Sequence, residues 1–209
     1  MRNYQKELEQ VLLKEENKGK TLLLHSCCAP CSSYVLVYLK EYFRITVFYY
    51  NPNITPDSEY RKRVEEQKRL IEALNRKGEG YPISYLDGDY EPEAFFTAVK
   101  GYEHCPERGE RCEICFRLRL EKSGKVAKEG KFDFFATTLT LSPLKNAELL
   151  NKIGEETGEK LGVSYLVSDF KKKDGYKTSI RLSQEYDLYR QDYCGCIYSK
   201  LERERNKEK

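Results

Sequence analysis

Five short apolar runs, each separated from the next by a longer charged stretch, constrain the fold of this chain more than any other feature. The runs are too short for helices and are rich in β-branched and aromatic residues, so we expect buried strands. The expected strands are Lys20–His25, Arg44–Tyr50, Tyr81–Leu86, Phe132–Thr137 and Val163–Val167. After an amphipathic N-terminal helix, helical patterns are expected over Pro30–Phe43, Asp57–Lys77, Ala94–Val99, Arg117–Glu129 and Asn146–Leu161, and over much of the remainder.

Strands that alternate with helices of this length predict an α/β fold, with a parallel sheet covered by helices on both faces. We expect about five strands in a three-layer, Rossmann-like arrangement of the HUP or adenine-nucleotide-hydrolase-like kind. A chain of 209 residues is long enough for one well-buried core, so we expect a single α/β domain over 1–209. Residues 170–209 are expected to form a basic, tyrosine-rich helical segment of that domain.

The composition favours a cytoplasmic protein. Hydrophobic residues make up 39% of the chain and charged residues 34%, and no apolar run approaches the ~20 residues of a membrane helix. The first twenty residues are charged throughout and lack the apolar centre of a secretory signal. In the reducing cytoplasm, clustered cysteines are more often metal ligands or redox groups than structural disulfides.

Eight cysteines are present, and seven of them fall into three clusters, in HSCCAPC, CEIC and YCGC. The clusters hold Cys27, Cys28 and Cys31; Cys112 and Cys115; and Cys194 and Cys196, while Cys105 stands alone. In parallel sheets, ligands bind beyond the carboxyl ends of the strands. We therefore expect the first cluster at that edge, together with Thr137 and Thr138 after the fourth strand and Asp87 and Asp89 after the third.

The cysteine spacing leaves several chemistries open. A vicinal pair plus a CxxC pair satisfies either a tetrahedral zinc or a four-iron cluster. Cys28 and Cys31 alone have the spacing of a thioredoxin-like redox motif. Cys194 and Cys196, separated by one glycine, suit a strained and easily reduced disulfide, and the alternative is two unpaired thiols.

The end of the chain has the composition of an RNA-binding surface. From residue 170 onward, eleven Lys or Arg residues stand against seven Asp or Glu residues, with five tyrosines interleaved. Basic side chains contact phosphates and aromatic rings stack on bases, although a solvated basic surface has the same composition. Candidate phosphate contacts are Lys171, Lys172, Lys173, Lys177, Arg181 and Arg190. No glycine-rich SGGxDS loop follows the first strand, so we do not expect ATP as a substrate.

Five segments carry a resemblance that spans about residues 22–199. LLLHSCCAPCSSYVL, FYYNPNITPDSEYRKR, GERCEICFRLRLEKS, FFATTLTLSPLKN and QDYCGCIYS, in this order, resemble the QueH type of epoxyqueuosine reductase. Five linked motifs make the resemblance far more specific than one CxxC. It implies that the chain reduces the epoxide of epoxyqueuosine, at the wobble position of tRNA, to queuosine in the last step of queuosine synthesis.

The resemblance also implies cofactors and residue roles. It implies a [4Fe-4S] cluster on Cys27, Cys28, Cys112 and Cys115, and a redox-active pair at Cys194 and Cys196. It further implies a second, mononuclear iron with cysteine and aspartate ligands. For this iron, and for a catalytic carboxylate, Cys31 and Asp89 are the candidates, followed by Asp87. Cys105 has no role in the family pattern.

Epoxide reduction consumes two electrons and two protons, so the resemblance requires a proton source and an electron-donating partner that the sequence does not identify. His25 and Tyr193 are candidate proton donors, and the tRNA anticodon loop is the expected macromolecular substrate. Two other classes of function stay open on the residues alone. One is a zinc-stabilised RNA-binding module, and the other is a metal-free thiol-disulfide oxidoreductase.

Overall fold

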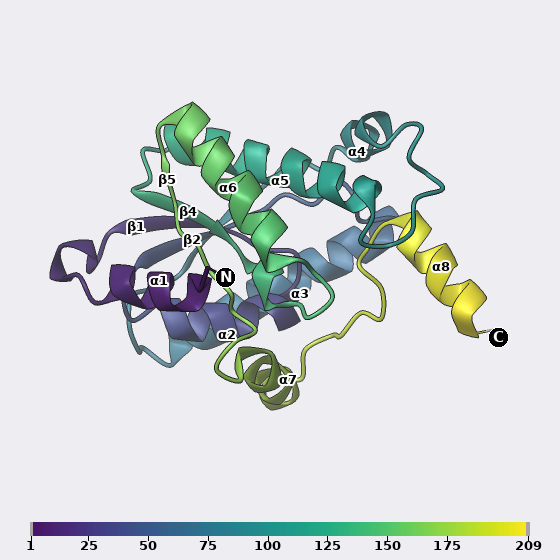
Figure 1. The fold of residues 1–209 in the computed structure, drawn as a ribbon. Helices are drawn as coiled ribbons and strands as arrows, with labels where there is room; N and C mark the ends of the chain where they lie inside the picture. Colours follow the sequence, from purple (N-terminus) through teal and green to yellow (C-terminus); the bar gives the residue numbers. More distant parts are fainter. Residues whose placement is uncertain (1, 208–209) are drawn as a thin grey trace.

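The computed structural model describes residues 2–207, which form a five-stranded parallel sheet between two layers of helices (Figure 1). The strands are β1 (Thr21–His25), β2 (Arg44–Tyr49), β3 (Ser84–Asp87), β4 (Phe134–Thr137) and β5 (Ser164–Tyr165). Their order is β3-β2-β1-β4-β5, and all neighbours are parallel. The expected α/β sheet of five strands, with helices on both faces, is confirmed.

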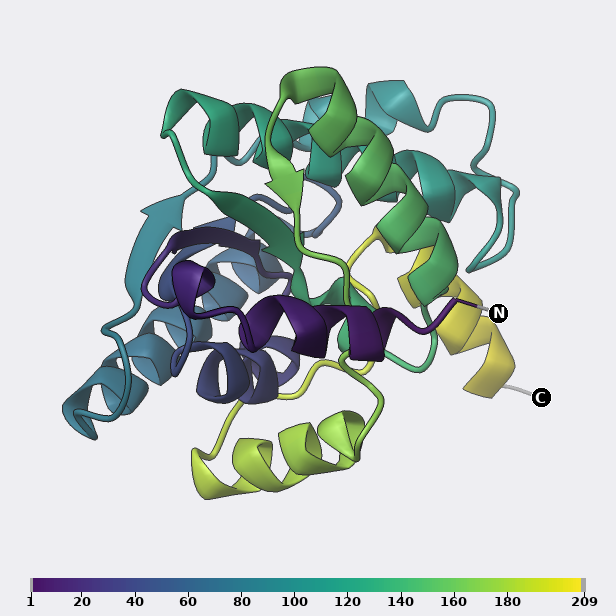
Figure 2. The ribbon, with the colours of Figure 1, turned by 60° about the vertical axis from the view of Figure 1, so that its left-hand side comes forward.

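The helices divide between the two faces of the sheet. One layer holds α1 (Tyr4–Leu12), α2 (Ala29–Leu39), α3 (Asp57–Arg76) and α7 (Gly175–Glu185), and Figure 2 shows α1, α2 and α7 together on that side. The other holds α4 (Pro92–Ala98), α5 (Glu110–Glu129) and α6 (Ala147–Leu161). The short helices η1 (Glu15–Asn17) and η2 (Thr138–Leu141) lie next to β1 and β4 in the chain, and α8 (Ile197–Lys207) ends the described residues.

Alternation along β1 explains why the sheet is covered on both faces. Leu22 and Leu24 pack in the core on the side of α2 and α3, whereas Leu23 packs on the opposite side with Phe135 and Ala127 of α5. All three leucines are fully buried. A strand buried on both faces has to be apolar at every position, as this run is.

The order of the strands reverses beside β1. The chain runs from β1 outward through β2 to β3, and then returns to place β4 on the other side of β1, followed by β5. Leu22 consequently pairs with both Ile45 and Phe134. The crevice beyond the carboxyl ends of such a pair is where ligands bind in open α/β sheets.

Three details differ from the expectation. α5 begins at Glu110, before CEIC, so that both cysteines of this motif lie in a helix. β5 is only two residues long, and the segment after Phe170 forms two helices with an irregular stretch over 186–196 between them.

Among residues 2–207, no helix combines the length and apolar character that crossing a membrane requires.

Candidate metal and substrate site

The loop after β1 and the first turn of α2 bring three thiols together. Cys28 precedes α2 as its N-cap, and Cys31 lies in the first turn behind Pro30. The Sγ atoms of Cys27 and Cys28 are 3.8 Å apart, and all three Sγ atoms lie within 4.8 Å of one another. Two sulfur ligands of one tetrahedral zinc, each about 2.3 Å from the metal, also stand about 3.8 Å apart. The three thiols are therefore close enough to hold a metal ion.

The CEIC cysteines approach this first cluster from α5. Cys112 packs against the buried cluster that contains Cys27 and Cys28, and the main-chain N–H of Arg108 donates to Cys112 Sγ at 3.3 Å. Cys115 is buried one turn further along the helix. Segments more than eighty residues apart in the sequence thus meet at one edge of the sheet.

The third cluster lies in the irregular stretch before α8. Cys196 is buried in the same apolar cluster as Cys115, and its Sγ accepts a hydrogen bond of 3.4 Å from the main-chain N–H of Ser199. Gly195 has a φ of +135°, which a residue with a side chain rarely adopts. The glycine therefore permits the turn that directs Cys194 into a cavity and Cys196 into the protein.

The thiols influence one another's protonation. Hydrogen bonds from Cys28 and Cys31 lower the pKa of Cys27 well below its ordinary value, and the same interaction raises the pKa of Cys28 to about 12. Burial raises the pKa of Cys115 to about 12 and also raises that of Cys112. Most of these thiols are protonated without metal, so metal binding releases protons.

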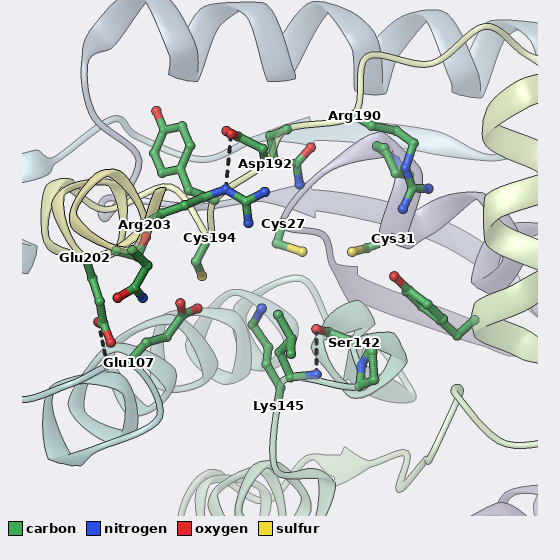
Figure 3. A pocket seen from close by; sticks show the side chains of 18 of the residues that line it. Cys27, Cys31, Glu107, Ser142, Lys145, Arg190, Asp192, Cys194, Glu202 and Arg203 are labelled. Carbon is green, nitrogen blue, oxygen red and sulfur yellow. Dashed lines mark hydrogen bonds and ion pairs between the residues drawn. The ribbon is translucent and has the colours of Figure 1, made fainter. Parts of the chain in front are cut away.

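A cavity of about 450 Å³ opens beside the cysteines (Figure 3). Three thiols line it, those of Cys27, Cys31 and Cys194, and they surround one space with the side chain of Lys145. The loop before α6, the stretch that leads into α8 and α8 itself form much of the remaining wall. Their contributions include Ser142, Pro143, Leu144, Arg190, Asp192, Tyr193, Glu202 and Arg203.

Lys145 is a charged cavity residue to which the sequence patterns assigned no role. Burial lowers the pKa of Lys145, but negative charge on the nearby sulfur atoms of Cys194, Cys27 and Cys31 raises it by more, so the net shift is upward. A positive charge thus faces three sulfur atoms across the cavity. The residue lies within the LSPLKN segment, but no spacing rule marks a single lysine as a cavity residue.

The two carboxylates expected at this edge point elsewhere. The side chain of Asp89 is 79% exposed and forms an ion pair of 3.7 Å with Lys122. Asp87 accepts a hydrogen bond of 3.1 Å from the hydroxyl of Tyr85. Neither carboxylate is among the residues that line the cavity.

The two proposed proton donors also differ in position. His25 is fully buried, with one ring nitrogen 2.9 Å from Thr137 Oγ1 and the other 3.1 Å from the carbonyl oxygen of Tyr50. Burial lowers the pKa of His25 to about 4, so the ring is neutral. Tyr193 does line the cavity, but its hydroxyl donates to the carbonyl oxygen of Thr55 at 3.0 Å.

Cys105 is separate from the three clusters in its contacts. Its buried thiol lies 4.0 Å from a carboxylate oxygen of Glu110 and lines a different pocket, with His104 and Arg111. This position agrees with leaving Cys105 out of the expected site.

The expected basic residues of 171–173 line a groove next to the cavity. The groove measures about 750 Å³ and shares Lys145 with the cavity. α1 supplies a further basic side chain, Lys6, and Arg2 precedes that helix. Arg190 lines the cavity itself.

Comparison with known proteins assigns the chain to a family. A family model described as epoxyqueuosine reductase QueH matches residues 22–202. An epoxyqueuosine reductase QueH from Staphylococcus epidermidis is 42% identical over 203 residues, which cover 95% of this chain and 85% of the relative. The protein of the same name from Thermotoga maritima is 37% identical, covering 88% of this chain and 92% of the relative. The chain therefore belongs to the epoxyqueuosine reductase QueH family.

Proposed function

We propose that this protein reduces the epoxide of epoxyqueuosine, at the wobble position of tRNA, to the cyclopentene of queuosine. The observation that carries the proposal is the convergence of three remote cysteine clusters at the carboxyl edge of the sheet: the first and third line one cavity there, and CEIC packs beside both. The reaction adds two electrons and two protons, breaks both carbon–oxygen bonds and releases the oxygen as water. Among protein side chains only dithiols supply electrons readily, so a thiol-rich cavity suits this chemistry.

We further propose that Cys27, Cys28, Cys112 and Cys115 hold a [4Fe-4S] cluster. The donor set fits such a cluster because it offers four thiols from two elements, each at least partly buried. The apolar cover of Phe116, Leu120 and Leu139 excludes water from one side. When bound, a cluster of this type supplies electrons one at a time.

A second, mononuclear iron is part of the proposal. Cys31 supports it, because its thiol lines the cavity within 4.8 Å of Cys27 and Cys28 and is not needed by the four-cysteine set. Asp89 is proposed as the carboxylate ligand and catalytic group on sequence grounds alone.

Cys194 and Cys196 are proposed as the redox pair that exchanges electrons with an external donor. Their positions support this role, because Cys194 faces the cavity and Cys196 packs against Cys115. Oxidation of the two thiols to a disulfide releases two electrons and two protons, the number that one epoxide reduction consumes. Lys145 is proposed to donate a hydrogen bond to the epoxide oxygen, since its ammonium faces the thiols across the cavity.

The basic groove is proposed to bind the backbone of the tRNA anticodon loop. Its cationic side chains are Arg2, Lys6, Lys145, Lys171, Lys172 and Lys173, against the acidic Glu9, Glu148 and Asp169. A nucleotide that enters the cavity has phosphates on both sides, and the groove lies next to the cavity, with Lys145 in the lining of both. Phosphate contacts position the loop, while the cavity selects the modified base.

Anaerobic purification followed by iron, sulfide and zinc analysis and a visible spectrum tests the proposal. We expect about four or more irons per chain, a broad absorbance near 400 nm and conversion of epoxyqueuosine in tRNA when a reductant is supplied. Stoichiometric zinc without this absorbance contradicts the proposal and favours the zinc-stabilised RNA-binding module. Reduction of a protein disulfide by metal-free enzyme, dependent on Cys28 and Cys31, favours the thiol-disulfide oxidoreductase instead.

A further inference from the structure

Arg119 is a fully buried cation without a carboxylate partner. Its side chain is 1% exposed, and no ion pair among residues 2–207 includes it. Arg63, buried to the same degree, pairs instead with Glu59 at 2.7 Å. Removing an uncompensated charge from water costs several kcal/mol, so a buried guanidinium of this kind needs an anion.

The hydrogen bonds of Arg119 do not supply that anion. Its Nε donates to the carbonyl oxygen of Cys115 at 3.2 Å, and its Nη1 donates to Oδ1 of Asn51 at 3.5 Å. Its Nη2 is buried and has no partner among the described residues. Both acceptors are neutral, and one donor group is left over.

The same two contacts place the guanidinium between the cysteine clusters. The carbonyl of Cys115 belongs to CEIC, whereas the amide of Asn51 donates at 2.8 Å to the carbonyl of Ser26, the residue before Cys27. Burial lowers the pKa of Arg119, and thiolates at Cys115, Cys194, Cys27 and Cys112 raise it. Three of these four thiols, those of Cys27, Cys112 and Cys115, belong to the proposed ligand set and become anionic when they bind metal, whereas the nearby Lys145 is a second cation.

We propose that Arg119 is the built-in counterion of the metal centre held by Cys27, Cys28, Cys112 and Cys115, and that its charge raises the reduction potential of that centre. This inference rests on the proposed cluster. A cluster with four thiolates carries a net negative charge, which grows by one unit on reduction, so a fixed cation nearby favours the reduced state. Arginine suits this role because it stays protonated even when buried.

The test compares the midpoint potential of the full-length, iron-loaded protein with that of three variants. Arg119→Met removes the charge and keeps most of the volume, and Arg119→Lys keeps the charge. Arg117→Met is the matched control, because Arg117 lies two residues away on α5 but is 38% exposed and pairs with Glu113 and Glu156. We expect Arg119→Met to shift the reduction equilibrium at least tenfold toward the oxidised state, or 59 mV for one electron. Arg119→Lys and Arg117→Met should stay near the wild-type potential.

Unfolding of the metal-free proteins in urea provides a readout that is independent of activity. Without the cluster the guanidinium is uncompensated, so apo Arg119→Met should be at least as stable as the apo wild type. Failure of Arg119→Met to retain iron, with apo stability preserved, also supports the counterion role. An unchanged potential in a loaded Arg119→Met protein overturns the inference, and so does a clear loss of apo stability. Absence of an iron–sulfur centre in the wild type would instead refute the proposed function.

Discussion

Arg63 donates a hydrogen bond of 3.0 Å from its Nη1 to the main-chain carbonyl of Cys194. Its Nη2 reaches the carbonyl of Tyr193 at 3.4 Å, and its Nε is paired with Glu59. A buried cation on α3 therefore holds the stretch that carries the third cysteine cluster, across 131 positions of sequence. Thr55 holds the same stretch from the other side, because its carbonyl accepts from the Tyr193 hydroxyl at 3.0 Å and its N–H donates to the carbonyl of Gly195 at 2.9 Å.

Arg63→Lys should loosen that stretch without unfolding the domain. A lysine keeps the ion pair with Glu59 but cannot maintain the fork of donors to the two carbonyls. Loss of one charged hydrogen bond costs about 2 kcal/mol, which corresponds to roughly thirtyfold faster local opening. Hydrogen exchange of amides 193–196 measures the effect, and Arg61→Lys on the exposed face of α3 is the control. Equal exchange in both variants would mean that Arg63 does not anchor the stretch.

Cys112→Ser should abolish binding of the proposed cluster, whereas Cys105→Ser should leave it intact. Serine is a poor ligand for iron–sulfur clusters. Cys112 packs against the apolar cluster that contains Cys27 and Cys28, while Cys105 lines a separate pocket. Iron and sulfide content per chain, together with the visible spectrum, measure the outcome. A Cys105→Ser protein that loses its cluster would refute the ligand assignment.

Lys172→Glu should weaken tRNA binding, with little effect on folding. Lys172 lines the basic groove, and a carboxylate there repels phosphates. We expect severalfold weaker binding. The slope of log affinity against log salt concentration should also become shallower, by the amount that about one phosphate contact contributes. Lys18→Glu is the matched control, since Lys18 is an exposed residue just before β1, at the opposite edge of the sheet. Equal losses in the two variants would point to net charge rather than to the groove.

Tyr165→Phe should stabilise the fold. The hydroxyl of Tyr165 is buried without a hydrogen-bond partner among the described residues, while its ring packs against Phe135 at a centroid distance of 5.1 Å. Removing an unsatisfied buried hydroxyl gains about 1 kcal/mol. Tyr60→Phe, which removes a hydroxyl that donates to the carbonyl of Gly88 at 3.2 Å, should be destabilising by a similar amount. Urea unfolding of the metal-free proteins measures both, and a less stable Tyr165→Phe would show that the hydroxyl is satisfied.

The sequence predicted those features of the fold that depend on local pattern. Leu22 to Leu24 form an apolar run that only a doubly covered strand explains, and the order of runs and helices follows from such patterns. Because parallel strands end at a common edge, the sequence also predicted that Cys27, which follows β1, lies beside that edge. The resemblance to a family added the grouping of cysteines, which spacing alone left open.

The sequence patterns could not predict in which direction a loop side chain points. Asp89 follows β3 at the expected edge, but its carboxylate turns outward to Lys122. Lys145 turns inward to the cavity from a loop of similar length. The missing carboxylate partner of Arg119 could not be foreseen either, because the chain contains 34 acidic residues, and only three-dimensional packing shows that none of those within residues 2–207 pairs with it.

The central position of β1 has a consequence for the order of folding. The main-chain N–H of Thr21 donates a hydrogen bond to the carboxylate of Asp133, 112 positions away in the sequence. The pairing of β1 with β2 joins residues that are much closer in the sequence, such as Thr21 and Arg44. Closing so long a loop is slow, so we expect β4 to dock on a partly formed sheet. α5, which carries Cys112 and Cys115, leads directly into β4. The docking of β4 would then also complete the proposed ligand set. If that set binds the proposed cluster, the supply of iron and sulfide should influence the yield of folded protein as well as its activity.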